Sequence, residues 1–567
     1  MTFIIYIANM MSYDLWSIFT PCLTFMICFI IFWHYKLKFS MEFYNLRTID
    51  TIYNLPILGH GIFLERSPEK LLKQLVAGAK KFKQKYPNEH KAILWMAPFM
   101  PVIIIFDARG AKEILPDKKW NDKSFFYKFL EPWLGTGLLI SNQEKWKSRR
   151  RMLTPAFHSR ILEEFVEVMN KHGKILVLKI DESLRKNKES NGSKSAEIDI
   201  LHLVTLTALD IICETACGFD LKSQENPDQE YIKCIYKATQ YVQHRQTQFW
   251  FWWDWSFKWF SSESKDMDHC LDVFYKFTRG VIDERIANKD MNKSMKKNGD
   301  ELTNNGKKKK QLAFLDLLID QYEQNEIDLK GITEEVDTFM FEGHDTTSSA
   351  LAFTSFLLAE KMNSKIQKNL SAEIDEKLSK IDDSCDDDDD DDDDNDDRKK
   401  FSKRVSNFNI ENADFDNLNY LDSIIREGLR IYPSVPYISR KRKSTSNWPF
   451  INFTVLNFLM FYVGRDPEFW EKPMEFWPER WSKSSDQDTS KINGTKMNTF
   501  SWIPFSAGSR NCIGQRFAVM EMKVVLSYLF KFFKFSNTIS RDELEENLMS
   551  DIILRPKDRL VLRVERR

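Results

Sequence analysis

The sequence predicts a mainly α-helical protein in which one membrane-spanning helix precedes a large globular part. Three segments support this class. Residues 15–33 carry no charged side chain, residues 333–360 place apolar side chains at helical spacing, and residues 515–526 combine strong helix formers with an apolar face. Hydrophobic residues make up 43% of the 567 residues, which is enough for a sizeable core.

The apolar stretch at residues 15–33 is close to the roughly 20 residues that cross a bilayer. Lys36 and Lys38 follow it and no Lys or Arg precedes it, so the positive-inside rule leaves the rest of the chain in the cytoplasm. A cleaved signal peptide would carry a basic start and a small-residue cleavage site, and neither is evident. We assign residues 1–40 to a membrane anchor and residues 50–567 to one globular domain; the alternative for the apolar stretch is a soluble helix.

Charge and cysteine content narrow the class further. The net charge is −1, which argues against a nucleic-acid partner. Eight cysteines are scattered without paired or zinc-like spacing, so we expect reduced thiols and no disulfide. Two strongly charged stretches, at residues 291–310 and 382–400, are predicted to be disordered surface insertions; the second includes nine consecutive aspartates.

Two further stretches differ in where their apolar side chains are expected to lie. Residues 199–218 read as a core helix. Residues 248–260 are unusually rich in Trp and Phe around only Asp254 and Lys258, which favours contact with a membrane-water boundary; burial in the core is the alternative.

One cysteine lies where a loop runs into a helix. Gly508 stands four residues before Cys512 and Gly514 two residues after it. Backbone N–H groups at this position favour a thiolate, and the glycines let a flat group approach the backbone closely. Such a thiolate can be the axial ligand of a haem iron; the alternative is a buried structural cysteine.

Polar groups in the middle of the helix at residues 333–360 predict chemistry. Thr333 is expected to cap this helix. Glu342 and Thr346 are i, i+4 neighbours and Gly343 opens a gap beside them. Acid and hydroxyl groups are costly in an apolar core, but delivery of protons to iron-bound oxygen needs them: Asp345 would relay a proton and Thr346 would hydrogen-bond dioxygen. A structural role, in which the hydroxyl bonds back to a helix carbonyl, is the alternative for Thr347.

A basic helix at residues 143–153 is expected to face the same site. Trp146 and Arg150 share one side of it, and together they can hold a carboxylate such as a haem propionate. The remaining basic side chains predict either an ordinary solvated face or a docking surface for an acidic electron donor; they are Lys145, Lys147, Arg149 and Arg151.

These motifs resemble those of the cytochromes P450. Residues 505–514 resemble the haem-binding signature through Phe505, Gly508, Arg510, Cys512 and Gly514, and residues 335–347 resemble the microsomal family 4 closely. The resemblance runs from about residue 50 to the C-terminus. It implies an α-rich domain with small sheets, a haem b between two central helices, and an ester between Glu342 and a haem methyl, as in many family 4 members.

The same resemblance assigns structural residues. Glu427 and Arg430 match the Glu-X-X-Arg helix pair, and Arg480 would be their third partner, so that the three lock the loop that presents Cys512. Arg440 matches an arginine that contacts a haem propionate. Trp481 stands where the family usually has Phe.

The resemblance breaks after Arg440. The family normally continues into a β-hairpin, whereas this chain rejoins the pattern near Val455 with Gly464 in place of His, so about one hairpin is missing. That region helps to line the substrate pocket. A divergent pocket, a degenerate copy and a mis-assembled gene model would all produce this pattern.

By resemblance, the chain implies a haem-thiolate monooxygenase that hydroxylates a fatty acid or a related lipid near its chain end. Electrons would come from NADPH through cytochrome P450 reductase, with cytochrome b5 as a further partner, at the endoplasmic reticulum membrane and on its cytosolic side. A haem-binding but catalytically impaired protein is the main alternative, because of the missing hairpin. A peroxide isomerase is disfavoured by the presence of Asp345 and Thr346.

Overall fold

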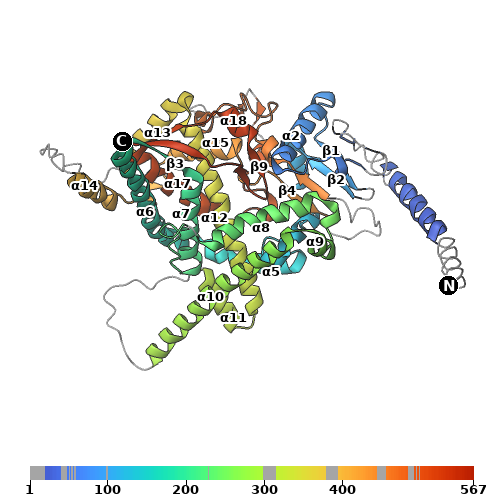
Figure 1. Ribbon diagram of the computed structural model, residues 1–567, viewed down its shortest axis with the longest axis horizontal. Helices are drawn as coiled ribbons and strands as arrows, with labels where there is room; N and C mark the ends of the chain where they lie inside the picture. The colour runs from blue at the N-terminus through green and yellow to red at the C-terminus, as the bar shows by residue number, and fades with distance from the viewer. Residues whose placement is uncertain are drawn as a thin grey trace, which may run out of the picture.

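The computed structural model describes residues 19–36, 38–39, 47–49, 52, 55, 59–97, 100–227, 229–297, 314–378, 394–442, 455–482, 491–492, 495–496 and 499–567. Helices make up most of the body (Figure 1). They are α2 (Pro68–Lys85), α3 (Ala108–Ile114), α4 (Glu131–Leu134), α5 (Gln143–Leu153), α6 (Ser159–Asn191), α7 (Ile200–Ile212), α8 (Glu230–Thr247), α9 (Asp254–Phe260), α10 (Glu263–Lys297), α11 (Phe314–Glu323), α12 (Leu329–Ala359), α13 (Ser364–Leu378), α14 (Asp394–Asn407), α15 (Asn419–Ile431), α16 (Met460–Val463), α17 (Gln515–Phe532) and α18 (Arg541–Glu546).

Within the described ranges, the strands form four small sheets. The largest has the order β1-β2-β5-β4, and the others are β3-β11-β8, β10-β9 and β6-β7. Their bounds are β1 (Lys91–Ala97), β2 (Met100–Ile105), β3 (Ser195–Asp199), β4 (Ile438–Lys441), β5 (Val455–Phe458), β6 (Lys491–Ile492), β7 (Thr495–Lys496), β8 (Phe533–Asn537), β9 (Leu548–Ser550), β10 (Leu554–Pro556) and β11 (Val561–Arg566). The predicted class, mainly helical with small sheets, is confirmed.

The helix at the N-terminus stands away from the body. It covers Phe19–Lys36, has a mean hydropathy of 1.3 and is only 6% buried, whereas the other apolar helix, Ile200–Cys217, is 78% buried. Figure 1 shows the first of these projecting from the rest of the molecule. The exposed helix therefore fits one N-terminal membrane anchor, and the buried one belongs to the core as predicted.

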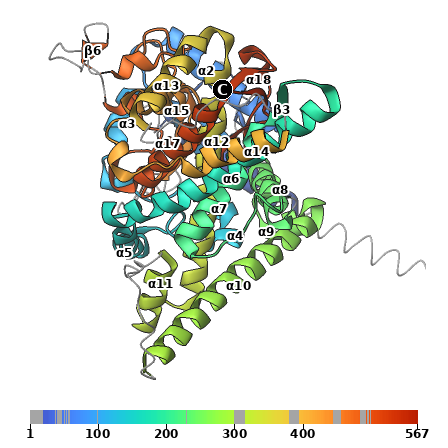
Figure 2. The same cartoon turned by 90° about the vertical axis from the view of Figure 1, so that its left-hand side faces the viewer.

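Helix α12 runs through the centre of the molecule (Figure 2). It packs against α7 and α17, and most of its side chains are buried. Its start differs from the predicted one: Asp328 is the N-cap, with its side chain accepting from the Gly331 N–H at 2.8 Å. Thr333 instead donates its hydroxyl to the Leu329 carbonyl inside the helix. Asp328 satisfies the free N–H groups one turn earlier.

Parts of the two predicted insertions are helical. Helix α10 extends to Lys297 and α14 begins at Asp394, so residues 291–297 and 394–400 are helical rather than disordered. Straight-chain side chains such as Lys and Met permit a helix without an apolar stripe. The remaining residues of these stretches, 298–310 and 382–393, lie outside the described residues.

The sheet beside the central cavity is continuous across the point where the family pattern breaks. β4 pairs directly with β5 in antiparallel register, with Arg440 opposite Leu456, and β5 runs parallel to β2. Residues 443–454 lie outside the described part of the chain. Among the described residues, Arg440, which is expected to face the cofactor, thus lies on the edge strand β4 of this sheet.

The aromatic segment predicted to touch a membrane is largely on the surface. Trp259 is 79% exposed and Phe260 70% exposed on α9, and Trp253 and Trp255 are also exposed. Phe257, on the inner face of α9, is buried. The alternative of burial in the core is therefore wrong for most of this segment.

Candidate active site

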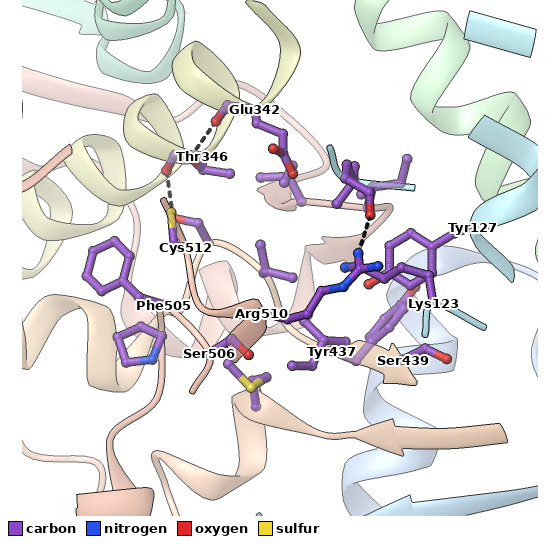
Figure 3. Close-up of a pocket in the computed structure, with 18 of the residues that line it drawn as sticks. Lys123, Tyr127, Glu342, Thr346, Tyr437, Ser439, Phe505, Ser506, Arg510 and Cys512 are labelled. Atoms are coloured by element: carbon purple, nitrogen blue, oxygen red, sulfur yellow. Dashed lines mark hydrogen bonds between the residues drawn. The ribbon is translucent and has the colours of Figure 1, made fainter. Parts of the chain in front are cut away.

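An interior cavity of about 340 Å³ lies between α12, the loop before α17 and the four-stranded sheet (Figure 3). Most of its walls are apolar, and its polar side chains gather in two places. One group surrounds Cys512 and Thr346, which face each other in Figure 3, and the other contains the basic side chains near the sheet. The cavity can thus hold a large apolar group that has one anionic edge.

Cys512 is presented by a closed loop. Its backbone N–H donates to the Phe505 carbonyl at 2.9 Å, and α17 begins three residues later. The sulfur opens into the cavity and is surrounded by protein beyond it. Burial and the charge of Glu342 raise the pKa of Cys512 to about 11, although the Gly514 N–H and Arg150 lower it. The backbone donor at Gly514 thus favours the thiolate, as expected, while burial opposes it; a bound metal would deprotonate the thiol.

The two glycines near the sulfur, Gly508 and Gly514, have different structural roles. Gly508 has φ +74° and packs so closely that a Cβ would lie 2.1 Å from the Leu115 carbonyl oxygen. It does not line the cavity, so its role is to shape the loop. Gly514 does line the cavity, and a Cβ there would meet only the Phe157 ring at 3.9 Å and the Cys512 sulfur at 4.0 Å. Of the two, Gly514 alone leaves room beside the sulfur.

Three cationic side chains converge on the edge of the cavity: Lys123, Arg440 and Arg510. Arg510 lies over the Trp146 ring with its Cζ 4.6 Å from the ring centroid, and it donates to the carbonyls of Leu139 and Ser141. Its Nε has no hydrogen-bond partner among the described residues. Burial, followed by the charge of Arg440, lowers the pKa of Arg510 to about 9.

Burial also lowers the pKa values of Arg440 and Lys123, the latter strongly. Lys123 additionally lies 4.1 Å from the Tyr127 ring. A cluster of buried cations with a free N–H is short of negative charge, so carboxylates would fit there.

Arg150 holds the cysteine loop instead of sharing a ligand directly with Trp146. Its guanidinium donates to the Asn511 carbonyl at 2.9 Å and to the Asn511 side chain at 3.0 Å. Trp146 is buried under Arg510. Both side chains line the cavity, as their i, i+4 spacing predicts, but each is already engaged with the loop around Cys512.

The opposite wall comes from the middle of α12. Thr346 donates its hydroxyl to the Glu342 carbonyl at 2.8 Å, and its own carbonyl accepts from Ser434 at 2.6 Å. Glu342 lines the cavity, and burial raises the pKa of its carboxyl, which Lys123 and Arg150 partly oppose. The gap predicted beside Gly343 is filled on one side, because a Cβ there would lie 2.7 Å from Ile212 of α7.

Asp345 faces away from the cavity. Its carboxylate pairs with Arg555 of β10, and both side chains are buried. Asp345 is therefore adjacent to Thr346 in sequence but does not line the cavity with it.

Comparison with known proteins identifies the family of the chain. The family model for Cytochrome P450 matches residues 51–563. The chain belongs to the cytochrome P450 family. It is 34% identical to human Cytochrome P450 4V2 over 94% of this chain and 92% of the relative, and 33% identical to Cytochrome P450 4c3 of Drosophila melanogaster over 90% of this chain and 88% of the relative. The predicted likeness to family 4 is confirmed, as is the enzyme class, a monooxygenase.

Members of the cytochrome P450 family carry haem iron and receive electrons from a redox partner. The cavity fits such a group on three counts. The Cys512 sulfur opens into it, Gly514 leaves room beside the sulfur, and the buried cations with the free Arg510 Nε suit two propionates.

The predicted brace behind the cysteine loop is present in this cytochrome P450. Arg430 donates to both oxygens of Glu427, at 2.9 and 2.8 Å, and Arg480 donates to Glu427 at 2.9 Å. Trp481, where the family usually has Phe, adds a donor at 2.8 Å through its indole N–H. Glu427 and Arg430 are fully buried, so this departure from the family pattern strengthens the network.

The basic face of α5 is only partly free. Lys145 pairs with Glu334 at 2.7 Å and Arg149 lies 3.7 Å from Glu335, both on α12. Lys147 and Arg151 are exposed. Lys147 also pairs with Glu144 at 2.7 Å, so Arg151 alone among these four basic side chains has no ion pair with a described residue.

Sequence reasoning missed Lys123 and Arg555. Lys123 follows Asp122 in a polar stretch that resembles a surface loop, and Arg555 lies near the C-terminus, 210 residues from its partner Asp345. Only the three-dimensional fold brings either of them to the site.

Proposed function

We propose that this cytochrome P450 hydroxylates a fatty acid or a related lipophilic substrate near its chain end, with electrons from NADPH through cytochrome P450 reductase. One observation carries the proposal: an apolar cavity places Cys512 opposite Thr346. An apolar lining suits a hydrocarbon chain, whose terminal carbon must be held in place to react. The resemblance to family 4 implies the same class of substrate.

The haem, held by Cys512 and by the arginines at the cavity edge, would supply oxygen activation that favours O–O cleavage. The chain's own residues manage position and protons. The Thr346 hydroxyl lies on the cavity wall and would hydrogen-bond dioxygen, and Asp345 would supply protons through it once its carboxylate is released from Arg555. Glu342 lines the cavity, and burial raises the pKa of its carboxyl to about 7; this position would let it form an ester with a haem methyl.

The proposed location is the endoplasmic reticulum membrane, with the catalytic domain on the cytosolic side. The exposed helix Phe19–Lys36 would span the bilayer, and the exposed aromatic side chains of α9 would enter its interface. Reductase, and cytochrome b5 where it takes part, would meet the face that includes Lys147 and Arg151.

The direct test uses the full chain in microsomes with reductase. We expect carbon monoxide binding with a thiolate-type Soret band, and NADPH-dependent hydroxylation of laurate near its methyl end. A thiolate-type band without NADPH consumption on any lipid would favour the alternative, a haem-binding but impaired protein. Absence of any haem band would contradict the proposed site itself.

A second experiment tests the ester. After turnover, the protein is denatured in acid and extracted with organic solvent. We expect part of the haem to stay with the wild-type chain and all of it to leave Glu342→Gln. Complete extraction from both would contradict the ester while leaving the monooxygenase assignment intact.

A third experiment tests Thr346. Thr346→Val keeps the shape of the side chain and removes its hydroxyl, so hydroxylated product per NADPH should fall by about 100-fold, the low end for a positioned proton donor. Thr338→Val is the matched control. Thr338 makes the same kind of hydrogen bond, to the Glu334 carbonyl four residues earlier in α12, but it does not line the cavity. Equal product yields from the two variants would contradict a role for the Thr346 hydroxyl.

A further inference from the structure

The turn between β9 and β10 holds a buried carboxylate without a hydrogen bond. Asp551 is 1% exposed, and neither of its carboxylate oxygens has a partner among the described residues. The next two residues, Ile552 and Ile553, line the cavity. Burying a carboxylate in this way costs free energy, so the position calls for an explanation.

The turn itself is firmly held. Tyr437 donates its hydroxyl to the backbone carbonyls of Ser550 and Asp551, at 3.2 and 3.0 Å. The Leu554 N–H donates to the Ser434 carbonyl at 2.7 Å, next to the contact between Ser434 and α12. Asp551 is thus fixed at the edge of the cavity by its backbone while its side chain stays unpaired.

The neighbouring cation is Arg555 of β10, which already pairs with Asp345. Its guanidinium lies 4.5 Å from the Tyr236 ring and its Nη1 is 3.5 Å from the Thr239 hydroxyl. Burial raises the pKa of Asp551 to about 6; the charge of Arg555 lowers it and that of Asp345 raises it. One buried guanidinium therefore serves two buried carboxylates and bonds only one of them.

This arrangement bears on proton supply. Hydroxylation of a C–H bond by dioxygen consumes two protons and two electrons and yields an alcohol and water. Asp345 cannot deliver those protons while Arg555 holds it away from the cavity. A route for release is therefore required.

We propose that Asp551 is the alternate acceptor for the Arg555 guanidinium, so that Arg555 can move from Asp345 to Asp551 and release Asp345 toward Thr346. The proposal rests on the proposed function and deepens it. Released Asp345 takes a proton from solvent, passes it to the oxygen side of the cavity and becomes a carboxylate again, after which Arg555 returns. Asp551 acts through Arg555 and does not touch the reacting atoms.

Other titratable groups that face this cluster do not replace Asp551. Burial raises the pKa values of Tyr236 and Tyr437 and lowers that of His344, so all three are neutral near pH 7. Glu69 is paired with Lys557 at 3.4 Å at the surface. Among the described residues around Arg555, Asp551 is the buried carboxylate left without a partner.

The test compares Asp551→Asn, Asp345→Asn and the double variant in the reconstituted enzyme. We expect hydroxylated product per NADPH to fall about 100-fold in Asp345→Asn and about tenfold in Asp551→Asn, because removal of a directly acting acid costs at least roughly 10²-fold. The double variant should equal Asp345→Asn, since Asp551 works only through Asp345. Asp551→Glu, which keeps the acceptor, should restore most of the yield.

Two controls separate this mechanism from a structural effect. Asp337→Asn removes another buried carboxyl of α12, one that bonds Thr278 and does not line the cavity, and should leave the product yield unchanged. The thiolate-type Soret band should persist in every variant. If Asp551→Asn does not fold, Asp551→Glu still tests the proposal through its pH profile, which should match that of the wild type.

Three results would overturn the proposal: a wild-type yield in Asp551→Asn, a double variant that multiplies the two losses, or an altered pH profile in a folded Asp551→Glu. An Asp345→Asn variant with full yield would instead overturn the proton role of Asp345 in the proposed function. The two failures are therefore distinguishable.

Discussion

Two buried carboxylates of this molecule are surrounded very differently. Glu427, behind the cysteine loop, accepts from Arg430 twice, from Arg480, from the Trp481 indole and from the Trp477 backbone. Asp551, in the turn between β9 and β10, accepts from no described group. A carboxylate whose oxygens are all hydrogen-bonded (a saturated carboxylate) holds its partners in one position. An unsaturated carboxylate, which lacks donors and lies beside a shared guanidinium, leaves that guanidinium two possible partners. The Glu427 cluster is therefore expected to be rigid, whereas the region of Asp551 and Arg555 is expected to change its pairing.

The largest effect should come from breaking the saturated cluster. Glu427→Ala leaves two buried guanidinium groups without their carboxylate, which should lower the free energy of unfolding by about 3–5 kcal/mol. The loop that presents Cys512 should then lose its support, so haem content should fall as well. Thermal unfolding and haem content measure both. Arg426→Ala is the matched control on the same helix, because Arg426 is exposed and its 2.6 Å pair with Asp422 should contribute at most about 0.5 kcal/mol. Similar losses in the two variants would contradict a special role for the Glu427 cluster.

Removing the unsaturated carboxylate, Asp551, should stabilise the protein at neutral pH, whereas removing Glu427 should destabilise it. Because burial raises the pKa of Asp551 above its ordinary 3.8 to about 6, its stabilising contribution is present at low pH and is lost as the pH rises through about 6. Asp551→Asn removes this titration. Relative to the wild type, the variant should therefore gain about 2 kcal/mol of stability between pH 4 and pH 8, at about 1.4 kcal/mol per tenfold change in proton affinity. Unfolding temperatures across this range check the sign; a wild type that gains on the variant as pH rises would contradict it.

The smallest effect concerns the chain's departure from its family. Trp481→Phe restores the usual residue and removes one of the five donors to Glu427, which should cost about 1–2 kcal/mol, as expected for a hydrogen bond to a charged group. Trp502→Phe offers a control, because its indole donates to a backbone carbonyl at the surface. An unchanged unfolding temperature in Trp481→Phe would show that the extra bond adds nothing to the saturated cluster.

The sequence could predict those features whose residues lie close together along the chain. The helix with Glu342 and Thr346, the loop of Cys512 and the Glu427–Arg430 pair are set by spacing within a few residues, and the structure places each as expected. Contacts over long sequence separations could not be read in this way. The pairing of Asp345 with Arg555 is one example, and the unpartnered state of Asp551 is another.

Burial, which acts through the whole fold, also limited some local expectations. Backbone donors near Cys512 do lower its pKa, but the enclosing protein raises it further. Gly508 is needed for a close approach to Leu115, a neighbour that only the folded chain reveals. The start of α12 shifted for a simpler reason, since Asp328 is also a good N-cap and stands one turn before Thr333.

The central claim is that the Cys512 sulfur ligates a haem iron, and the reduced, carbon monoxide-bound spectrum of two cysteine variants tests it most directly. Cys270→Ser changes a buried thiol that does not line the cavity, and it should keep the thiolate-type Soret band of the wild type. Cys512→Ser should bind haem weakly or not at all and should lose that band. A thiolate-type band that survives in a folded Cys512→Ser protein would contradict the claim.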